Sequence, residues 1–174
     1  MASTNLKMLN KTGNNIFSDE CYTPPQAIDP LLSYLPIDWI YYDCTSGKSS
    51  KIIDFLKTKN INCLSSKDRN FLEDDLFSSD LPSFDAIITN PPYSKKDKFI
   101  ERCYKIGKPF ALLLPVSSLQ GQSRGKLFSK YGIDLLVLNK RIDFTGKGSP
   151  HFGVAWYCYK ILPKTISHGN ILFI

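Results

Sequence analysis

Short apolar runs alternate along the chain with segments whose apolar residues recur at helical spacing. The apolar runs predict buried strands at 39–44, 61–65, 84–89, 110–116, 133–138 and 154–162. The helical spacing predicts helices at 23–35, around 52–56, at 96–106 and at 123–131. Strands that alternate with helices are typical of a mostly parallel sheet with helices on both faces, so we expect an α/β fold with about seven strands.

The first 20 residues are polar and lack periodicity, so we expect a flexible leader over 1–20 and one domain over 21–174. In the first predicted helix, Thr23 is placed to cap the N-terminus and Pro30 to kink the axis. No apolar run approaches the roughly 18 residues of a spanning helix, and the N-terminus has no signal-peptide core. We expect a cytoplasmic protein without a membrane segment, located in the host cytoplasm if the source is a virus.

The sequence offers little for metal or disulfide chemistry. Its 5 cysteines are scattered, and none has the paired CxxC spacing that chelates zinc. The 2 histidines, His151 and His168, are too few for a histidine-based metal site or a serine–histidine–aspartate triad. We therefore expect reduced thiols and no bound metal.

Charge is divided unevenly along the chain, although the total is only +6. Up to Asn90 there are eight Lys and Arg against twelve Asp and Glu, a net charge of −4. Beyond Asn90 there are fourteen against four, a net charge of +10. A basic surface can serve solubility alone. Clustered Lys and Arg also gain affinity for phosphate backbones by releasing counterions, so the second half favours a nucleic-acid partner.

Two segments that follow predicted strands carry unusual residues, and ligands of open parallel sheets bind beyond the carboxyl ends of strands. The first segment is 43–49 (DCTSGKS) and the second is 90–93 (NPPY). The end of the first segment matches a phosphate-binding P-loop, but that loop needs a glycine where Tyr42 stands. A P-loop is therefore excluded. Either the segment is an ordinary turn, or Asp43 and Gly47 face a ligand with a charged amino acid or ribose part.

The second segment is the more specific of the two. Two consecutive prolines remove two backbone donors and stiffen the chain, which a continuing strand does not tolerate. This rigidity aims the Asn90 side chain and the Pro91 carbonyl outward, and Tyr93 offers an aromatic face. We infer a pocket for a planar amino group held by two acceptors and stacked on a ring, in preference to a simple strand-ending turn.

Segments 43–49 and 90–93, in this order, resemble the motifs of class I S-adenosylmethionine-dependent amino-methyltransferases with an NPPY motif. The similarity extends from about Tyr22 to Leu162 and is greatest to small phage- or virus-type N6-adenine DNA methyltransferases. The first segment resembles their D-x-x-x-G-x-G cofactor loop, with Ser49 in place of the last glycine. The resemblance implies a single Rossmann-like methyltransferase domain without a separate target-recognition domain, and S-adenosyl-L-methionine as the cofactor.

The resemblance also implies roles for particular residues. The catalytic pocket would be formed by Asn90, Pro91, Pro92 and Tyr93. The cofactor would be bound by Thr23, Pro24, Asp43, Thr45, Gly47, Asp68, Asp74 and Asp75. Among these, Asp68 is the candidate for the ribose hydroxyls, and Asp74 or Asp75 for the adenine amino group of the cofactor.

The basic half supplies candidates for contacts with a nucleic-acid backbone. These candidates are Lys95, Lys96, Lys98, Arg124, Lys126, Lys130, Lys140, Arg141 and Lys147. The loop 145–152 (TGKGSPHF) is either a substrate loop or an ordinary hairpin connection. We expect Trp156 in the core rather than in a stacking platform.

The NPPY motif leaves the substrate open. Similar motifs serve enzymes that methylate DNA adenine, RNA bases or a protein glutamine, because all present a planar amine or amide nitrogen. The charge division favours nucleic acid, and we prefer adenine N6 in DNA over RNA. The alternative from another class is a catalytically inactive, methyltransferase-like module that binds nucleic acid or a partner, as Ser49 and the weakly marked ribose acid suggest.

Overall fold

A seven-stranded sheet forms the centre of the structure, a computed structural model that describes residues 23–46, 50–66, 69–75, 83–144, 146, 148, 152–163 and 171–173. The strands are β1 (Tyr41–Asp43), β2 (Cys63–Ser65), β3 (Ala86–Thr89), β4 (Phe110–Pro115), β5 (Asp134–Val137), β6 (Val154–Tyr159) and β7 (Ile171–Phe173). Their order in the sheet is β2-β1-β3-β4-β6-β5-β7. Neighbouring strands are parallel except that β6 runs antiparallel to both β4 and β5. The predicted mostly parallel sheet is confirmed.

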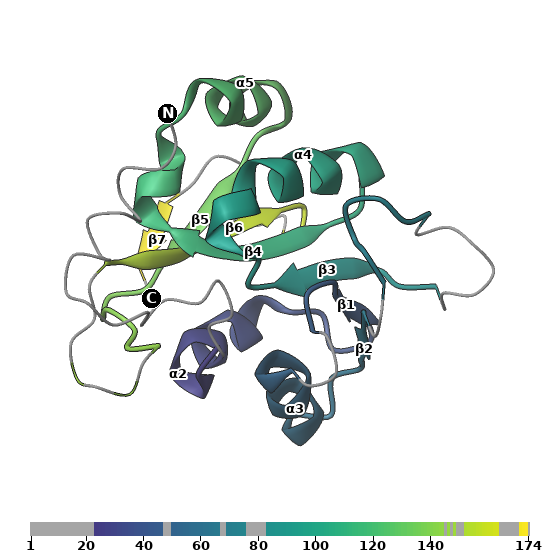
Figure 1. The fold of residues 1–174 in the computed structure, drawn as a ribbon. Coiled ribbons are helices and arrows are strands. Elements are labelled where there is room, and N and C mark those ends of the chain that lie inside the picture. The colour runs from purple at the N-terminus through teal and green to yellow at the C-terminus, as the bar shows by residue number, and fades with distance from the viewer. Residues whose placement is uncertain are drawn as a thin grey trace, which may run out of the picture.

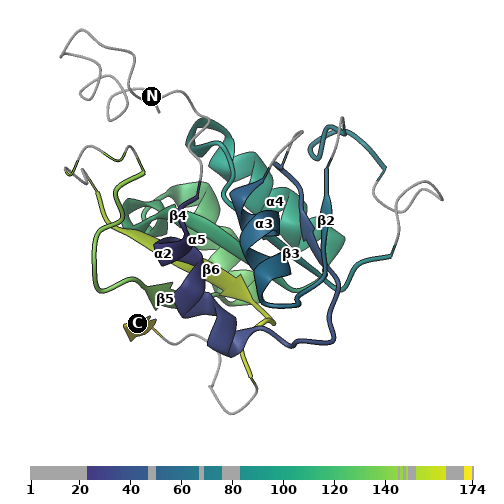
Figure 2. The same ribbon diagram turned by 90° about the horizontal axis from the view of Figure 1, so that it is seen from below.

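Helices cover both faces of the sheet (Figure 1). On one face lie α4 (Lys96–Ile106) and α5 (Gln122–Tyr131). On the other lie α2 (Pro25–Ile28), its 3-10 continuation η2 (Asp29–Tyr34) and α3 (Lys51–Thr58), which pass in front of the sheet when it is seen from below (Figure 2). The short 3-10 turns η3 (Tyr93–Lys95) and η4 (Val116–Leu119) follow β3 and β4.

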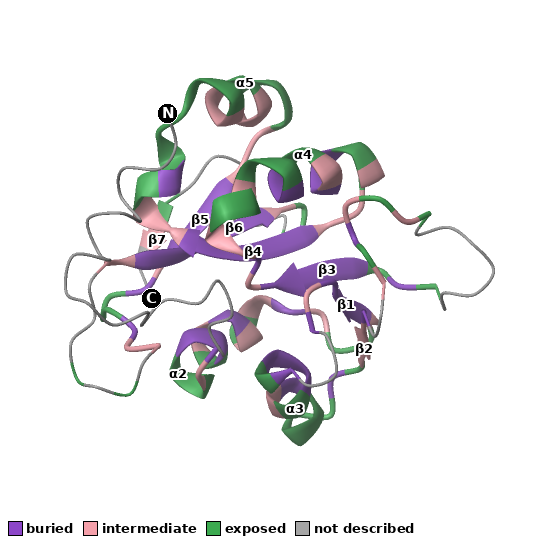
Figure 3. Ribbon diagram, in the orientation of Figure 1, coloured by how far each residue is buried: buried purple, intermediate pink, exposed green. Residues whose placement is uncertain are grey.

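The central strands are buried on both faces, as their colour in Figure 3 shows. Apolar side chains gather in one cluster toward α2 and α3 and in another toward α4. Trp156 of β6 is fully buried, with 0% of its surface exposed, and its Nε1 donates to the Ala27 carbonyl at 2.7 Å. The prediction that Trp156 belongs to the core is confirmed. Its hydrogen bond also fastens α2 to the sheet.

The helix predicted at 23–35 divides into two parts. Pro30 has no N–H to continue the α-helical pattern, and the chain tightens into η2 from Asp29 onward. The predicted cap at Thr23 is wrong, because Pro24 occupies the N-cap position and no side chain caps the helix. By contrast, α4 has the predicted bounds and ends at Gly107, whose φ of 77° suits a residue without Cβ.

The structure also bears on the expected leader, membrane segment, thiols and metal. Residues 1–20 lie outside the described residues. Within the described segments, no helix has the length and apolar character needed to cross a membrane. The described cysteines, Cys44, Cys63, Cys103 and Cys158, are free thiols. Among the side chains that the structure describes, no three from His, Cys, Asp or Glu gather so as to hold a metal ion.

Candidate active site

The two motif segments meet at the carboxyl ends of the neighbouring strands β1 and β3. The chain passes from β1 to β2 on one side and later returns to β3 on the other, which makes β1 and β3 a topological switch point. Ligands of open α/β sheets bind in the crevice beyond the carboxyl ends of such strands. Residues 43–46 leave β1 there, and 90–93 leave β3. The Thr45 hydroxyl oxygen lies 2.5 Å from that of Thr89, the last residue of β3, and 3.3 Å from the Asn90 carbonyl oxygen, so the two segments are in direct contact.

Asp43 ends β1 as a buried carboxylate, with 2% of its surface exposed. Its Oδ1 accepts hydrogen bonds from the Thr89 hydroxyl at 2.6 Å and the Thr45 N–H at 3.2 Å. Its Oδ2 accepts from the Ser50 hydroxyl at 2.5 Å, and the Ser50 oxygen caps α3 by accepting from the Ile53 N–H at 3.2 Å. Burial raises the pKa of Asp43 above its ordinary value, although these hydrogen bonds oppose the rise. Asp43 therefore joins β1, β3 and α3 from inside.

The raised pKa of Asp43 predicts a change in the pH dependence of stability. A carboxyl with a higher pKa in the folded chain stabilises it fully below the unfolded value of about 3.9, and this contribution is lost as the pH rises through the folded pKa. Asp43→Asn carries no charge to bury. As the pH increases from about 4, the free energy of unfolding of the variant should therefore fall less than that of the wild type. Urea unfolding of both proteins from about pH 4 upward measures the two slopes. Identical slopes would contradict the assignment.

The NPPY segment forms a rigid corner between β3 and α4. Asn90 is half-buried and Pro91 is buried, while Tyr93 begins η3 and leads directly into α4. The Tyr93 carbonyl accepts from the Lys96 ammonium at 3.2 Å, which fixes the end of the corner. The Tyr93 ring meets Phe152 edge to face, with centroids 5.9 Å apart and planes inclined by 73°. The corner thus has a pair of aromatic rings beside it.

Phe152 is held near the corner by the chain around it. The neighbouring Gly153 carbonyl accepts from the Val116 N–H at 3.0 Å, just beyond the end of β4. A Cβ on Gly153 would stand 3.6 Å from the Val116 side chain, an ordinary van der Waals distance, so this position has room for a small side chain. The structure therefore brings together residues that follow β3, follow β4 and precede β6.

The loop that ends at Phe152 is organised by a carboxylate. Asp143 accepts from the N–H of Gly146 at 3.1 Å and from that of Gly148 at 2.5 Å. Both glycines have left-handed backbones, with φ of 70° and 79°, where a side chain would be strained. The predicted loop 145–152 accordingly ends beside the NPPY corner. Outside the described residues lie Thr145, Lys147, Ser149, Pro150 and His151.

The two predicted acids for the cofactor's adenine differ in their surroundings. Asp74 Oδ2 accepts from the Asn70 N–H at 2.6 Å, and the Asp74 carbonyl accepts from the Arg102 guanidinium at 2.6 Å. The carboxylate of Asp74 therefore holds its own turn. Asp75 is exposed, which makes it the better placed of the two to meet a ligand.

The remaining predicted cofactor residues are only partly described. Thr23 is buried, and the Pro24 carbonyl accepts from the Ala27 N–H at 2.9 Å at the start of α2. Gly47 and Asp68 lie outside the described residues, as does Ser49.

The structure adds two hydroxyl residues that sequence reasoning missed. Ser66, directly after β2, donates from its N–H to the Ser46 hydroxyl at 2.7 Å, and the two hydroxyl oxygens are 3.0 Å apart. Thr89, the last residue of β3, bonds Asp43. Both sit at the carboxyl end of a strand next to the switch point. Their position directly at the end of a predicted strand could have identified them from the sequence. Serine and threonine are, however, common at strand ends and in turns, so their residue types alone did not mark them as functional.

The predicted nucleic-acid contacts fall into two groups. Lys95, Lys98, Lys126, Lys130, Lys140 and Arg141 are exposed, and Lys147 lies outside the described residues. Arg124 forms an ion pair with Asp97 and donates to the carbonyls of Ser118 and Gln120, and its side chain is only 11% exposed. The internal contacts of Arg124 tie α5 to α4, so we remove it from the expected surface. Lys96 is half-buried against the Tyr93 carbonyl.

Lys98 provides a prediction in which binding and stability change in opposite directions. It lies in the first turn of α4, where a positive charge opposes the helix dipole. Lys98→Gln should therefore raise the free energy of unfolding by about 0.3–1 kcal/mol. If Lys98 contacts a phosphate, the same change should reduce the slope of log affinity for duplex DNA against log salt by about 0.9.

Lys57 supplies the matched control, because it lies in the last turn of α3, where a positive charge is favourable. Lys57→Gln should lower the stability slightly and leave the salt slope unchanged. Chemical unfolding and a salt titration of duplex binding measure both quantities. A slope that changes equally in the two variants would count against a specific contact at Lys98.

Solved structures show what this arrangement is similar to. No family model and no curated protein matches the chain in sequence. A protein from Listeria monocytogenes assigned as a class I S-adenosylmethionine-dependent methyltransferase superposes with a TM-score of 0.58 at 14% identity, over 97% of this chain and 70% of that one. A protein from Pyrococcus horikoshii assigned as an RNA methyltransferase gives 0.53 at 14% identity, over 94% and 100%.

A third similar structure is larger. It is a protein from Vibrio vulnificus assigned as the modification subunit of a type I restriction enzyme, with a TM-score of 0.53 at 14% identity over 92% of this chain. This chain spans 48% of that subunit, or about half its length. At these identities the similarity establishes the fold: the chain has the Rossmann-like α/β fold of S-adenosylmethionine-dependent methyltransferases.

Proposed function

We propose that this chain is an S-adenosylmethionine-dependent methyltransferase that acts on the exocyclic N6 of adenine in DNA. One observation carries the proposal: the NPPY corner and the segment after β1 touch at the switch point of a methyltransferase fold, where the Thr45 hydroxyl lies 3.3 Å from the Asn90 carbonyl oxygen. A methyl donor beyond β1 and an amine held at the corner would therefore face each other. The coincidence of motif, fold and position supports this function over an ordinary turn at either segment.

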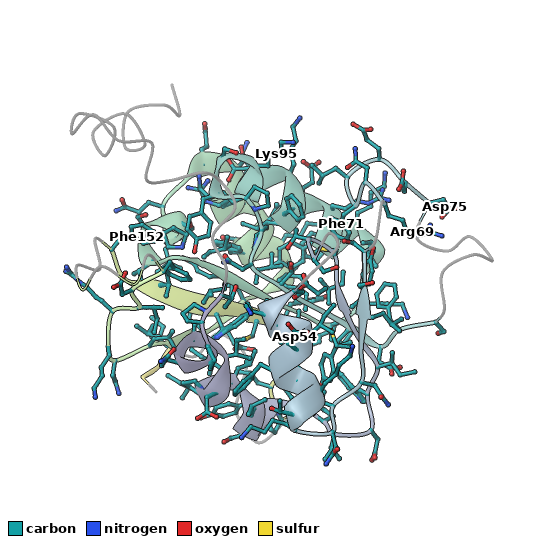
Figure 4. All side chains as sticks on the ribbon, turned by 60° about the horizontal axis from the view of Figure 1, so that its bottom comes forward. Asp54, Arg69, Phe71, Asp75, Lys95 and Phe152 are labelled. Atoms are coloured by element: carbon teal, nitrogen blue, oxygen red, sulfur yellow. The ribbon has the colours of Figure 1, made fainter. Side chains whose placement is uncertain are left out.

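The exposed acid proposed for the cofactor and the aromatic ring beside the corner lie apart in the structure. Figure 4 shows Asp75 on one side of the molecule and Phe152 on the other, with Lys95 between them. β4 and β5 point in the same direction, because both are antiparallel to β6. The exposed Lys140 and Arg141, which follow β5, therefore lie at the same end of the strands as the NPPY corner. Acidic groups near β1 and β2 suit the cofactor, and basic groups near α4 and β5 suit phosphates.

The residues beyond β1 and β2 fit S-adenosylmethionine, which carries ribose hydroxyls, an adenine amino group and a cationic sulfonium. Asp75 offers an exposed carboxylate on this side, and Thr45 and Ser46 line the turn after β1. We retain Asp68 and Gly47 as further candidates, together with Thr23, Pro24, Asp43 and Asp74. When bound, the cofactor supplies a methyl group on a sulfonium, an electrophile that needs no further activation.

The chain's own task is to position the acceptor nitrogen. The lone pair of an exocyclic aromatic amine is delocalised into the ring, which makes the amine a poor nucleophile. Hydrogen bonds from its two N–H groups to the Asn90 side-chain oxygen and the Pro91 carbonyl would favour a more tetrahedral nitrogen with an available lone pair. No strong base is required before attack. Alignment of this kind can supply about 7–11 kcal/mol of the barrier reduction.

A base in duplex DNA must first be flipped into the pocket, which costs a few kcal/mol. Tyr93 and Phe152 are the aromatic surfaces next to the corner. Stacking of a base on such rings is worth about 1–3 kcal/mol and offsets part of this cost. The contact between Tyr93 and Phe152 therefore supports loop 145–152 as a substrate loop.

An RNA base is the second candidate substrate. The protein assigned as an RNA methyltransferase is covered over 100% of its length, so its size matches that of this chain. An RNA substrate could be recognised by short loops of this domain, by a partner subunit or through the shape of the nucleic acid.

The proposed function is tested by transfer of a radiolabelled methyl group to parallel substrates. These are a duplex of A·T pairs, a duplex of G·C pairs, an adenine-containing RNA and a glutamine-containing protein mixture. We expect label in the A·T duplex and none in the G·C duplex, whose cytosine also carries an exocyclic amine. Label mainly in RNA or protein would reassign the substrate. Cofactor binding without any transfer would identify an inactive module.

A further inference from the structure

Two threonine hydroxyls connect the buried carboxylate of Asp43 with the main chain of Asn90. Thr89 donates to Asp43 Oδ1 at 2.6 Å, and its oxygen lies 2.5 Å from that of Thr45. The Thr45 hydroxyl also lies within hydrogen-bond distance of the Asn90 carbonyl, at 3.3 Å. The proposed reaction assigns no role to the Thr89 hydroxyl.

The donor and acceptor roles of the Thr89 and Thr45 hydroxyls follow from their partners. Thr89 has one hydroxyl hydrogen and donates it to Asp43 Oδ1. The Thr89 oxygen then accepts from Thr45, whose hydroxyl also lies 3.3 Å from both Asp43 Oδ1 and the Asn90 carbonyl oxygen. Thr89 is fully buried, so these partners replace the water that its hydroxyl loses on folding. The side-chain orientation of Thr89 is therefore determined by Asp43.

Asp43 is in turn held from a third element. Its second oxygen accepts from Ser50, and Ser50 caps α3. Both carboxyl oxygens are thus engaged within the protein, and neither α3 nor β1 can shift without breaking a hydrogen bond to Asp43. Asp43 is consequently a fixed point against which the neighbouring segment is oriented.

We propose that Thr89 and Thr45 are positioning residues that set the main chain at Asn90 for the acceptor amine, with Asp43 as their anchor. This inference rests on the proposed function, because it takes Asn90 as the residue that holds the amine. Thr89 directly precedes Asn90, so fixing its side chain fixes the peptide that leads into the corner. The prolines that follow transmit this orientation, since their φ angles cannot adjust.

The test compares Thr89→Val, which removes the hydroxyl and keeps the shape, with Thr89→Ser, which keeps the hydroxyl. Thr89→Val should lower kcat by about 10–100-fold, since a misplacement near 1 Å can cost 10²-fold. The KM for A·T duplex and the cofactor Kd should change by less than about twofold. Thr89→Ser should stay within about threefold of the wild-type kcat.

Thr58→Val is the matched control. Like the Thr89 hydroxyl, the Thr58 hydroxyl donates a short hydrogen bond within the protein, to the Phe55 carbonyl at 2.6 Å. Thr58 lies at the exposed end of α3, away from the corner. This variant should leave kcat, KM and cofactor affinity unchanged. If Thr89→Val does not fold, Thr45→Val replaces it, because Thr45 is only half-buried. Thr45 is also a proposed cofactor residue, so amide exchange in the corner, and not kcat, is then the deciding measurement.

Amide hydrogen exchange provides a readout that does not depend on activity. Pro91 and Pro92 carry no amide hydrogen, so exchange in the corner reports the N–H groups of Asn90 and Tyr93. Thr89→Val should speed this exchange by about threefold or more, and Thr89→Ser should not.

The outcomes separate this inference from the proposed function. Loss of kcat in Thr89→Val with rescue in Thr89→Ser supports the inference. Unchanged kcat and unchanged exchange in Thr89→Val, or equal losses in both variants, would overturn it. If the wild type transfers no methyl group, the proposed function fails, and the exchange experiment still decides whether Thr89 orients the corner.

Discussion

Asn90→Ala is expected to lower kcat for methyl transfer to an A·T duplex by about 10²–10³-fold, because it removes a preorganised acceptor that acts mainly in the transition state. The substitution leaves the second proposed acceptor, the Pro91 carbonyl, in place. Cofactor affinity should change by less than about twofold, since the proposed cofactor residues follow β1 and β2 rather than β3. Transfer of a tritiated methyl group measures the first quantity and calorimetry the second.

Asn62→Ala is the control for this prediction. Asn62 is exposed just before β2, and only its main-chain carbonyl is engaged, by accepting from the Tyr41 N–H at 2.9 Å. The control should retain wild-type kcat and cofactor affinity. If Asn90→Ala loses cofactor binding in proportion to methyl transfer, Asn90 supports the cofactor or the fold and does not hold the amine.

The second large effect is expected at the aromatic pair. Tyr93→Ala and Phe152→Ala should each weaken substrate binding by about 5–150-fold, which corresponds to the 1–3 kcal/mol of base–aromatic stacking. The two rings contact each other, so their effects should not add. A double-mutant cycle on the affinity for an adenine-containing duplex measures this coupling.

Tyr93→Phe separates stacking from other roles of the tyrosine. It keeps the ring and its edge-to-face contact with Phe152, so the affinity should remain within about threefold of the wild type. An affinity loss in Tyr93→Phe as large as that in Tyr93→Ala would show that the hydroxyl, rather than the ring, binds the substrate.

Local patterns predicted much of the fold. The helix at 96–106 is found with its predicted bounds, because Phe99, Ile100 and Cys103 give it one apolar face and Gly107 ends it. The apolar runs at 86–88 in β3 and 110–114 in β4 contain no polar residue and predict strands. The NPPY corner was recognisable from sequence because the stiffness of two prolines is a property of the residues themselves.

Features that depend on distant contacts were not predictable in the same way. Arg124 was expected on the surface because the sequence contains only its charge, whereas its ion pair with Asp97 arises from the packing of α5 on α4. β7 was not predicted because its residues show no alternation, and Ile171 is 55% exposed at the sheet edge. Its place is fixed by pairing with β5.

The site shows the same division between local and distant information. Asp43 and Thr45 were candidates for the cofactor because they belong to a motif, but the engagement of Asp43 by Thr89 depends on β1 and β3 becoming neighbours. Thr89 and Asp43 are 46 positions apart in sequence, so local patterns give no sign of this contact. A buried acid at the end of one strand and a hydroxyl residue at the end of the next form a pattern worth seeking in other parallel sheets.

Nucleoside mass spectrometry of an A·T duplex incubated with S-adenosylmethionine tests most directly whether the corner holds an adenine amine for methyl transfer. The wild type should produce N6-methyldeoxyadenosine, and Asn90→Ala should produce almost none although calorimetry shows that it still binds the cofactor. Equal amounts of product from both proteins, or methylation of a different atom of the base, would contradict the account.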